Sequence, residues 1–400
     1  MTSGRRKTPQ GESDDTKMIE TGRHAAPRFH ALNPPVERAS TMIFPDYATF
    51  KEEAPKIRYG RLGASTHRAF EESLCALEGA AGCVLAPSGL AAITLSILAC
   101  TEAGAKILVS DAVYGPTRYF CNQALKRFGV ETVYYDPMTD ITPLMDGRVS
   151  AVMTESPGSL TFEVQDVHAA VEAARASGAA VLCDNTWGAG YFYKPLALGA
   201  DISIQACTKY VVGHADALIG AVLCRDEATH RKVFRTALNL GLCVSPDDVY
   251  LAHRGLRTMG TRLRQHEATG KRLAGWLADR PEIEAVLHPA RPDCPGHEIW
   301  RRDFTGATGL FGAVLKPEID DAALGRFLDA SRHFAMGFSW GGYESLCVPV
   351  RPERDRTVRL WPHKGRLLRF HAGLEDADDL IADLEAAFHA MAGGAAKQPR

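Results

Sequence analysis

The sequence contains no apolar run that is long enough to cross a bilayer. The most apolar stretch, residues 89–100, is about half the length of a membrane-spanning helix. Pro87, Ser88 and Gly89 form a turn before it, so we interpret the stretch as a buried helix. The chain also opens without a secretory signal, so we expect a cytoplasmic protein that has no membrane partner.

An excess of either charge is also lacking. Lysine and arginine together number 46, aspartate and glutamate number 48, and the formal net charge is -2. Because there is no long basic run, the sequence lacks the positive surface that binds nucleic acid, and we expect no nucleic-acid partner. The remaining composition, with 46% hydrophobic and 24% charged residues, is typical of a globular protein.

The ten cysteines are scattered along the chain, and no two of them form a C-x-x-C pair. Most of them lie in apolar runs, where cysteine acts as a small hydrophobic side chain. We therefore predict buried thiols in a reducing compartment rather than a disulfide framework. His214, His253 and His266 are likewise too widely spaced for a metal-ligand motif, and we expect no metal site.

The first 60 residues lack the pattern of long helices or strands. Residues 1–16 contain almost nothing apolar, which is typical of a disordered tail. The prolines at positions 27, 34, 35, 45 and 55 exclude long regular elements in the rest of this region. We therefore predict a tail and then an extended N-terminal arm, which ends at the sequence RYGR, residues 58–61.

From residue 61 to residue 255, strand-like and helix-like segments alternate. Strands are predicted at 83–86, 106–110, 130–135, 149–154, 179–183 and 202–207, and helices at 90–100, 117–128 and 164–177. Such alternation indicates an α/β domain in which a mostly parallel sheet is covered by helices on both faces.

A second domain is expected because 400 residues exceed what one core usually supports. A helical and basic stretch at 249–264 would bridge to this domain, which we place at residues 256–400. Helices are predicted near 270–279, 322–330 and 377–391, and a strand at 310–315. These elements predict a smaller C-terminal α+β domain.

Two charged residues follow predicted strands of the first domain. Asp184 follows the strand at 179–183, and Lys209 follows the strand at 202–207. Either residue alone would ordinarily be a solvent-exposed loop residue. In a parallel sheet, however, the carboxyl ends of the strands share one edge, where ligands gather. The pair therefore indicates a site at that edge.

The chain resembles the fold-type-I pyridoxal-phosphate enzymes of cysteine and methionine metabolism, from about residue 18 to residue 392. Within that family it is most similar to the bacterial β-lyase branch. The resemblance implies a seven-stranded, mostly parallel sheet. The stretches that carry it are YGRLGASTH at 59–67, LEGAAGCVLAPSGLAA at 77–92, ESPGS at 155–159, CDNTWGAG at 183–190, SIQACTKYVVGHADALIG at 203–220, LRTMGTRLRQH at 256–266, FSWGGYESL at 338–346 and LLRFHAGLED at 367–376.

The resemblance implies that Lys209, Asp184 and Tyr114 act on pyridoxal 5'-phosphate. Lys209 would be bonded covalently to the cofactor and would then take the α-proton of the substrate as a base. Asp184 would pair with the pyridine nitrogen and keep it protonated, so that the ring withdraws electrons. Tyr114 would stack on the ring and assist proton transfer.

The phosphate would be bound by the turn of Ser88, Gly89 and Leu90, since backbone N–H groups at a helix N-terminus suit an anion. Thr208 would add a hydroxyl donor. The resemblance also implies that Tyr59 and Arg61 reach from the arm into the phosphate site of a neighbouring subunit. Each active site would then be shared in a homo-oligomer, for which we expect a tetramer built as a dimer of dimers.

Three further residues are expected on the substrate side. Arg369 is a charge within an apolar strand and needs a partner, which is either an internal carboxylate or, as the resemblance implies, the α-carboxylate of the substrate. Ser339 and Trp340 would line the pocket near this arginine, together with Tyr59 from the arm.

Two departures from the family pattern bear on the chemistry. Ala206 stands where many relatives carry a serine that donates to the phosphate, so phosphate binding must rely on Thr208, the Gly89 turn and Arg61. Ser159 stands where γ-lyases and synthases commonly carry an asparagine. This serine and the tryptophan of SWGGYES are familiar in the β-lyase branch, and both favour β-elimination.

The expected activity is therefore that of a carbon–sulfur lyase of methionine biosynthesis, which converts cystathionine to homocysteine, pyruvate and ammonia. A β-lyase for other cysteine S-conjugates and a γ-lyase of the same family are alternatives. A non-catalytic regulatory protein that binds the cofactor is a further alternative. The complete set of Lys209, Asp184, Tyr114 and Arg369 argues against it, because binding alone does not require every one of them.

Overall fold

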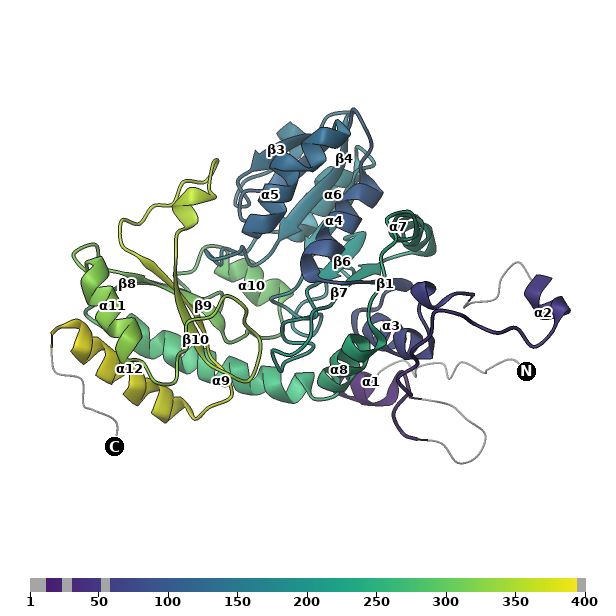
Figure 1. Ribbon diagram of the computed structural model, residues 1–400. Coiled ribbons are helices and arrows are strands. Elements are labelled where there is room, and N and C mark those ends of the chain that lie inside the picture. Colours follow the sequence, from purple (N-terminus) through teal and green to yellow (C-terminus); the bar gives the residue numbers. More distant parts are fainter. Residues whose placement is uncertain (1–11, 24–30, 52–57, 394–400) are drawn as a thin grey trace.

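Two sheets organise the protein, as seen in a computed structural model that describes residues 12–23, 31–51 and 58–393 (Figure 1). The larger sheet has the order β1-β7-β6-β5-β4-β2-β3. Strands β2 to β6 pair in parallel, whereas β7 is antiparallel to both of its neighbours. The strands are β1 Gly82–Ala86, β2 Lys106–Ser110, β3 Glu131–Tyr135, β4 Val149–Glu155, β5 Ala180–Asp184, β6 Ile202–Gln205 and β7 Gly220–Cys224. The predicted seven-stranded, mostly parallel sheet is confirmed.

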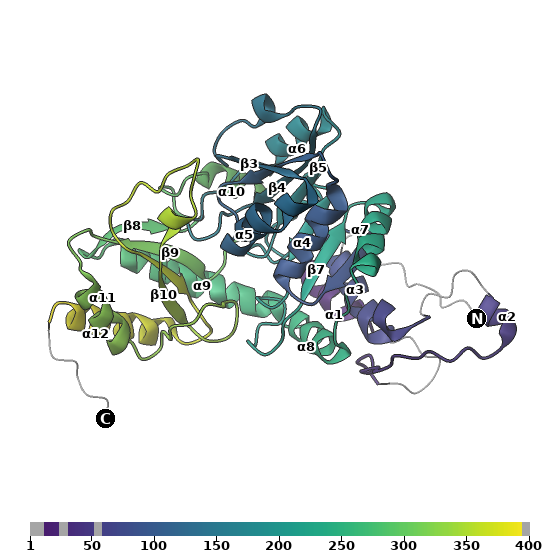
Figure 2. The same ribbon diagram turned by 45° about the horizontal axis from the view of Figure 1, so that its top comes forward.

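Helices cover both faces of this sheet, which explains why its strands are nearly continuous apolar runs. Successive residues of a strand point to opposite faces. Ile107 therefore packs with α4 and α7, whereas Leu108 packs with α6. Helices α4 and α7 lie side by side (Figures 1 and 2). The helices of this domain are α3 Ser65–Glu78, α4 Gly89–Cys100, α5 Gly115–Gln123, α6 Val167–Arg175, α7 Glu227–Asn239 and α8 Pro246–Leu256.

The second sheet is antiparallel, with the order β10-β11-β9-β8. Its core includes Phe311 and Phe370 from the strands, and Phe327 and Phe388 from the helices. The elements are α9 Met259–Ala278, β8 Ile283–Leu287, α10 His297–Asp303, β9 Leu310–Leu315, α11 Asp321–Ala330, β10 Leu346–Val350, β11 Leu367–His371 and α12 Ala377–Met391. This is the smaller α+β unit that the sequence predicts.

The predicted helical bridge at 249–264 consists of two helices. Helix α8 ends at Leu256 and α9 begins at Met259. Helix α8 packs mainly on α3, whereas α9 packs on β8 and β9. The placement of the domain boundaries at residues 60 and 255 stays a prediction.

The N-terminal region is more regular than predicted. Helices α1 (Asp14–Glu20) and α2 (Tyr47–Lys51) form within it, so the prediction of disorder is wrong for residues 14–16. Ser13 caps α1, Met18 is buried, and the guanidinium group of Arg257 donates to the carbonyl oxygens of Ile19 and Thr21 at 2.8 Å. Local composition misses this helix because it packs on α3 and is bound at its end by Arg257, both far away in the sequence. Residues 1–11 of the predicted tail lie outside the described residues.

A buried carboxylate and a buried ion pair join the small domain to the large one. The Asp111 carboxylate pairs with Arg118 and also accepts hydrogen bonds from the backbone N–H groups of residues 357–359. Nearby, Arg356 pairs with Glu163 at 2.8 Å, and both side chains are 4% exposed. The segment at 356–359 is therefore attached to the large domain beside the end of β2.

Several predicted absences can be examined in the described part of the chain. All ten cysteines are unpaired and eight are buried, which confirms the prediction of buried thiols. No described helix is both long and apolar enough to span a membrane. Among the described residues, no group of three or more His, Cys, Asp or Glu side chains is arranged to hold a metal ion.

Candidate active site

The carboxyl edge of the large sheet brings the predicted residues together. Asp184 is the last residue of β5 and pairs in register with Glu155, the last residue of β4. Strand β6 ends at Gln205, and a turn then carries Lys209 to the same edge. The site therefore forms where parallel strands end, as the sequence predicts.

The amine of Lys209 lies between this edge and the small domain. Its Nζ donates to Ser339 Oγ at 2.9 Å and lies 5.4 Å from the centre of the Trp340 ring. Burial and the positive charge of Arg369 lower the pKa of Lys209 to about 8, while the negative charge of Asp184 acts in the opposite direction. A neutral amine is therefore accessible near neutral pH, and a neutral amine is what a nucleophile or base requires.

Asp184 is a buried carboxylate at the end of β5. It is 6% exposed, and its Oδ1 accepts the backbone N–H of Thr186 at 3.0 Å. Burial raises the pKa of Asp184, whereas the hydrogen bonds from Thr186 and the charge of Lys209 lower it. A protonated ring nitrogen would supply the charge that this buried oxygen pair lacks, so the residue fits pyridoxal phosphate.

Glu155 is a residue of this site that the sequence argument missed. Its Oε2 accepts the backbone N–H of Tyr114 at 2.6 Å. Desolvation and the neighbouring charge of Asp184 raise the pKa of Glu155 well above its usual value. One of the two carboxyl groups therefore holds a proton readily. The signal was available, since Glu155 ends a strand as Asp184 does.

Tyr114 lies at the N-terminus of α5, directly after the end of β2. The side chain is half-exposed, so one face of the ring is open to a ligand. Burial and the negative charges of Glu155 and Asp184 raise the pKa of Tyr114, while Arg369 lowers it. The phenol therefore keeps its proton near neutral pH and can donate a hydrogen bond.

The turn for which phosphate binding is predicted lies at the N-terminus of α4. Ser88 is the N-cap, and its Oγ accepts the N–H of Ala91 at 3.1 Å. The N–H groups of Gly89 and Leu90 begin the helix and have no carbonyl group one turn earlier with which to pair. A Cβ on Gly89 would lie 2.4 Å from Cβ of Ala206. The helix start therefore packs directly on the segment that leads to Lys209, which fits a phosphate at this position.

Thr208 makes hydrogen bonds that the sequence does not predict. Its Oγ1 donates to the carbonyl oxygen of Ile219 at 3.2 Å and accepts the Ile219 N–H at 3.0 Å. Donation to a phosphate would require the hydroxyl to exchange its bond to that carbonyl group. Its predicted role stays a proposal.

Arg369 projects from β11 and meets a loop of the small domain. Its Nη2 donates to the carbonyl oxygens of Gly337, Phe338 and Ser339 at 3.1, 2.8 and 3.3 Å. Burial lowers the pKa of Arg369. Within the described residues it forms no ion pair, so the internal carboxylate considered above is not found there. This leaves its positive charge for an anionic ligand.

Tyr59 and Arg61 are not brought to Lys209 within one chain. Arg61 Nη1 donates to the carbonyl oxygen of Leu238 at 3.4 Å, and Tyr59 forms a β-bridge with Thr41 and is half-exposed. The segment that carries α2 runs outward from the body of the protein (Figure 1).

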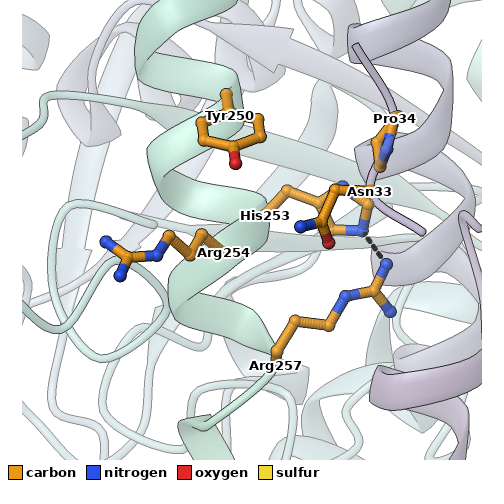
Figure 3. Close-up of a pocket in the computed structure, with 6 residues that line it drawn as sticks. All are labelled: Asn33, Pro34, Tyr250, His253, Arg254 and Arg257. Carbon is orange, nitrogen blue, oxygen red and sulfur yellow. Dashed lines mark hydrogen bonds between the residues drawn. The ribbon is translucent and has the colours of Figure 1, made fainter. Parts of the chain in front are cut away.

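Two hollows on the surface lie away from these residues. The larger, of about 330 Å³, is in the small domain between α9 and α10 and includes His288 and Trp300. The other lies between α8 and residues 33–34 (Figure 3). There, His253 Nε2 accepts from Arg257 Nη2 at 2.8 Å, and burial and the Arg257 charge lower the pKa of His253 to about 3. Arg257 also donates to the carbonyl oxygens of Ile19 and Thr21, so this junction holds the end of α1.

Known proteins are similar in sequence to this chain over most of its length. The chain is 43% identical over 387 residues to cystathionine β-lyase MetC of Escherichia coli (strain K12), which covers 94% of this chain and 98% of the relative. It is 41% identical over 387 residues to cystathionine β-lyase of Salmonella typhimurium, with the same coverage.

A solved structure shares the fold. Cystathionine γ-synthase from Xanthomonas oryzae pv. oryzae, in complex with cystathionine, superposes with a TM-score of 0.88 at 29% sequence identity, covering 97% of this chain and 100% of that chain. Residues 15–389 match the family described as Cys/Met metabolism PLP-dependent enzyme. The chain therefore belongs to that family, and its cofactor is pyridoxal phosphate.

Proposed function

We propose that this protein is a carbon–sulfur lyase that cleaves cystathionine, with one water, to homocysteine, pyruvate and ammonia. The observation that carries the proposal is the meeting of Lys209 and Asp184, at one edge of the large sheet, with Arg369 of the small domain. Burial and these charges set the pKa of the amine at about 8. The two curated relatives named above, both called cystathionine β-lyases, support the choice of substrate.

Each proposed residue has a task that follows from its surroundings. When bound, pyridoxal phosphate withdraws electrons from the α-carbon of the substrate. Asp184 holds the proton of the ring nitrogen, and the N–H groups of Gly89 and Leu90 bind the phosphate. Arg369 offers a fixed fork of donors to the α-carboxylate. This arrangement orients the substrate in the site.

Proton transfer falls to Lys209 and Tyr114. The amine takes the α-proton at Nζ, where Ser339 Oγ holds it by a hydrogen bond at 2.9 Å. The C–S bond at the β-carbon then breaks, and its electron pair leaves with the sulfur as homocysteine thiolate. The protonated phenol of Tyr114 is placed to donate a hydrogen bond during this step. The centre of the Trp340 ring also lies near the amine, 5.4 Å from its nitrogen.

The oligomeric state is part of the proposal. We infer a homo-oligomer with shared sites, a tetramer built from dimers, in which Tyr59 and Arg61 complete the phosphate site of a second subunit. The support is that Arg61 contacts Leu238 rather than the N-terminus of α4 in its own chain. The small domain and the arm would then both contribute to one pocket.

Product analysis tests the reaction. With cystathionine, β-elimination releases pyruvate and homocysteine, whereas γ-elimination releases 2-oxobutyrate and cysteine. We expect Lys209→Ala to lower turnover by at least about 10²–10⁴-fold, the usual contribution of a general base. Lys271→Ala is the matched control, since Lys271 pairs with Glu267 on the surface of α9. Near-normal turnover by Lys209→Ala, or 2-oxobutyrate as the main product, contradicts the proposal.

A further inference from the structure

Strand β11 carries two polar side chains that hold the same loop. Arg369 and His371 are two residues apart and so point to one face of the strand. Arg369 donates to carbonyl groups of residues 337–339. His371 Nε2 lies 3.1 Å from the backbone nitrogen of Gly341 and 3.2 Å from the carbonyl oxygen of Gly342. The loop at 337–342 is therefore held at two points.

The same loop rests on the backbone of Lys209. Gly341 has a φ of +86°, and an added Cβ there would lie 2.8 Å from the carbonyl carbon of Lys209 and from the nitrogen of Tyr210. Only glycine fits this left-handed and closely packed position. The residues just before Gly341 are Ser339 and Trp340, which contact the Lys209 amine. A shift of the loop would therefore move both groups relative to that amine.

The imidazole of His371 is buried and neutral. It is 1% exposed, and burial lowers its pKa well below the usual value, with further lowering by the charges of Arg369 and Lys209 and by His266. Its Nε2 accepts the Gly341 N–H when the proton is on Nδ1, and among the described residues Nδ1 has no hydrogen-bond partner. A buried donor without a partner destabilises the fold. A leucine at this position would have no unpaired donor. The advantage of histidine here is therefore its hydrogen bond to the turn.

We propose that His371 is a positioning residue, which holds the turn at Gly341 so that Ser339 and Trp340 meet Lys209. The inference rests on the proposed role of Lys209 as the reacting amine. Because Arg369 holds the first half of the loop by itself, loss of His371 should disturb the proton-transfer side of the site more than the binding of the α-carboxylate.

The test compares His371→Leu with His371→Gln. Leucine removes the hydrogen bond, and we expect amide hydrogen exchange at residues 338–343 of the cofactor-free protein to rise about tenfold, the effect of one lost bond. In the loaded enzyme, kcat should fall by about the same factor while KM for cystathionine stays within about threefold. Glutamine has a separate donor and acceptor for Gly342 and Gly341, so it should restore both readouts.

Two further variants guard against a general loss of stability. His288→Leu removes another buried histidine of the small domain, which contacts Ala290, and should leave exchange at 338–343 and kcat unchanged. Gly341→Ala moves the turn without altering His371 and should reproduce the fall in kcat. It also provides the kinetic test should His371→Leu fail to fold.

Three outcomes would overturn the inference. They are unchanged exchange at residues 338–343 in His371→Leu, equal effects of His371→Leu and His371→Gln, and normal kinetics in Gly341→Ala. The two proposals can fail separately, because the exchange measurement needs no turnover. If His371→Leu raises exchange at residues 338–343 but the unsubstituted protein has no lyase activity, the proposed reaction is refuted and the contact of His371 with the loop is not.

Discussion

At the scale of single residues, the chemistry of Lys209 depends on what surrounds it. Burial disfavours the charged amine, the guanidinium group of Arg369 disfavours it further, and the carboxylate of Asp184 favours it. The net result is a pKa of about 8 instead of the ordinary lysine value of about 10.4. Arg369 and Asp184, the groups proposed to bind the substrate and the cofactor, thus shift the pKa of the same amine in opposite directions.

Capture of pyridoxal phosphate by the cofactor-free protein should report this pKa. Only the neutral amine attacks an aldehyde, so the capture rate should rise with pH and level off above a midpoint near 8. Removal of the positive charge in Arg369→Met should move the midpoint upward, and Asp184→Asn should move it downward. Stopped-flow absorbance measures the rate at each pH.

Arg272→Met is a matched control for that titration, because Arg272 pairs with Asp378 on the surface of the small domain. It should leave the midpoint unchanged. A midpoint near 10 in the unsubstituted protein, or equal shifts from Arg369→Met and Arg272→Met, would show that the site does not tune Lys209 as described.

At the scale of elements, the first turn of α4 must approach the segment that leads to Lys209. The approach depends on Gly89, because a Cβ at that position would lie 2.4 Å from Cβ of Ala206. Because of this close approach, Ala206 has a packing role, at a position where the family resemblance implies a phosphate-binding serine in many relatives. Phosphate site and lysine are therefore joined by direct contact between one helix and one strand end.

Gly89→Ala should weaken cofactor binding. Overpacking of this kind costs about 1–3 kcal/mol, and it would push the helix start away from the phosphate. Absorbance titration with pyridoxal phosphate gives the affinity, and thermal unfolding gives the stability. Gly275→Ala in α9 is the control, since a Cβ there meets no atom within 4 Å and alanine favours a helix by about 1 kcal/mol. Equal cofactor affinity in the two variants would refute the packing argument.

At the scale of the whole molecule, one chain supplies only part of the proposed site. The small domain contributes Arg369, Ser339 and Trp340, and the buried pair of Arg356 and Glu163 keeps this domain attached to the large one. Tyr59 forms a β-bridge with Thr41, and Arg61 donates to the carbonyl oxygen of Leu238 in the same chain. In the proposed oligomer, a second chain supplies Tyr59 and Arg61 to complete the site.

Mixed oligomers test whether sites are shared. Lys209→Ala and Arg61→Ala chains should each have little activity alone. In a hybrid dimer, one of the two sites would combine Lys209 from one chain with Arg61 from the other. After unfolding and refolding together, the mixture should regain about a quarter of the unsubstituted activity, because about half of the dimers are hybrids. Activity no greater than that of the two variants measured separately would exclude sharing.

Local pattern was enough to predict much of the fold. Strand β2, strand β9 and helix α12 form with the predicted bounds, because apolar runs and 3.6-residue periodicity express how each segment meets a core. Lys209 and Asp184 were predicted for a similar reason: a charge that ends an apolar strand is conspicuous in the sequence. Local pattern could not predict that Gly89 packs on Ala206 or that Arg369 contacts the loop at 337–339.

The sequence by itself therefore determined the fold class, many of the helices and strands, the family, and the charged residues that follow two central strands. Only the tertiary structure decided that residues 14–20 form a helix, that Glu155 shares its edge with Asp184, and that His371 holds the turn over Lys209. The physical reason is that each of these depends on contacts between segments far apart in the chain. The burial of these residues, their hydrogen bonds and the closeness of their charges arise only when the two sheets and the surrounding helices pack together.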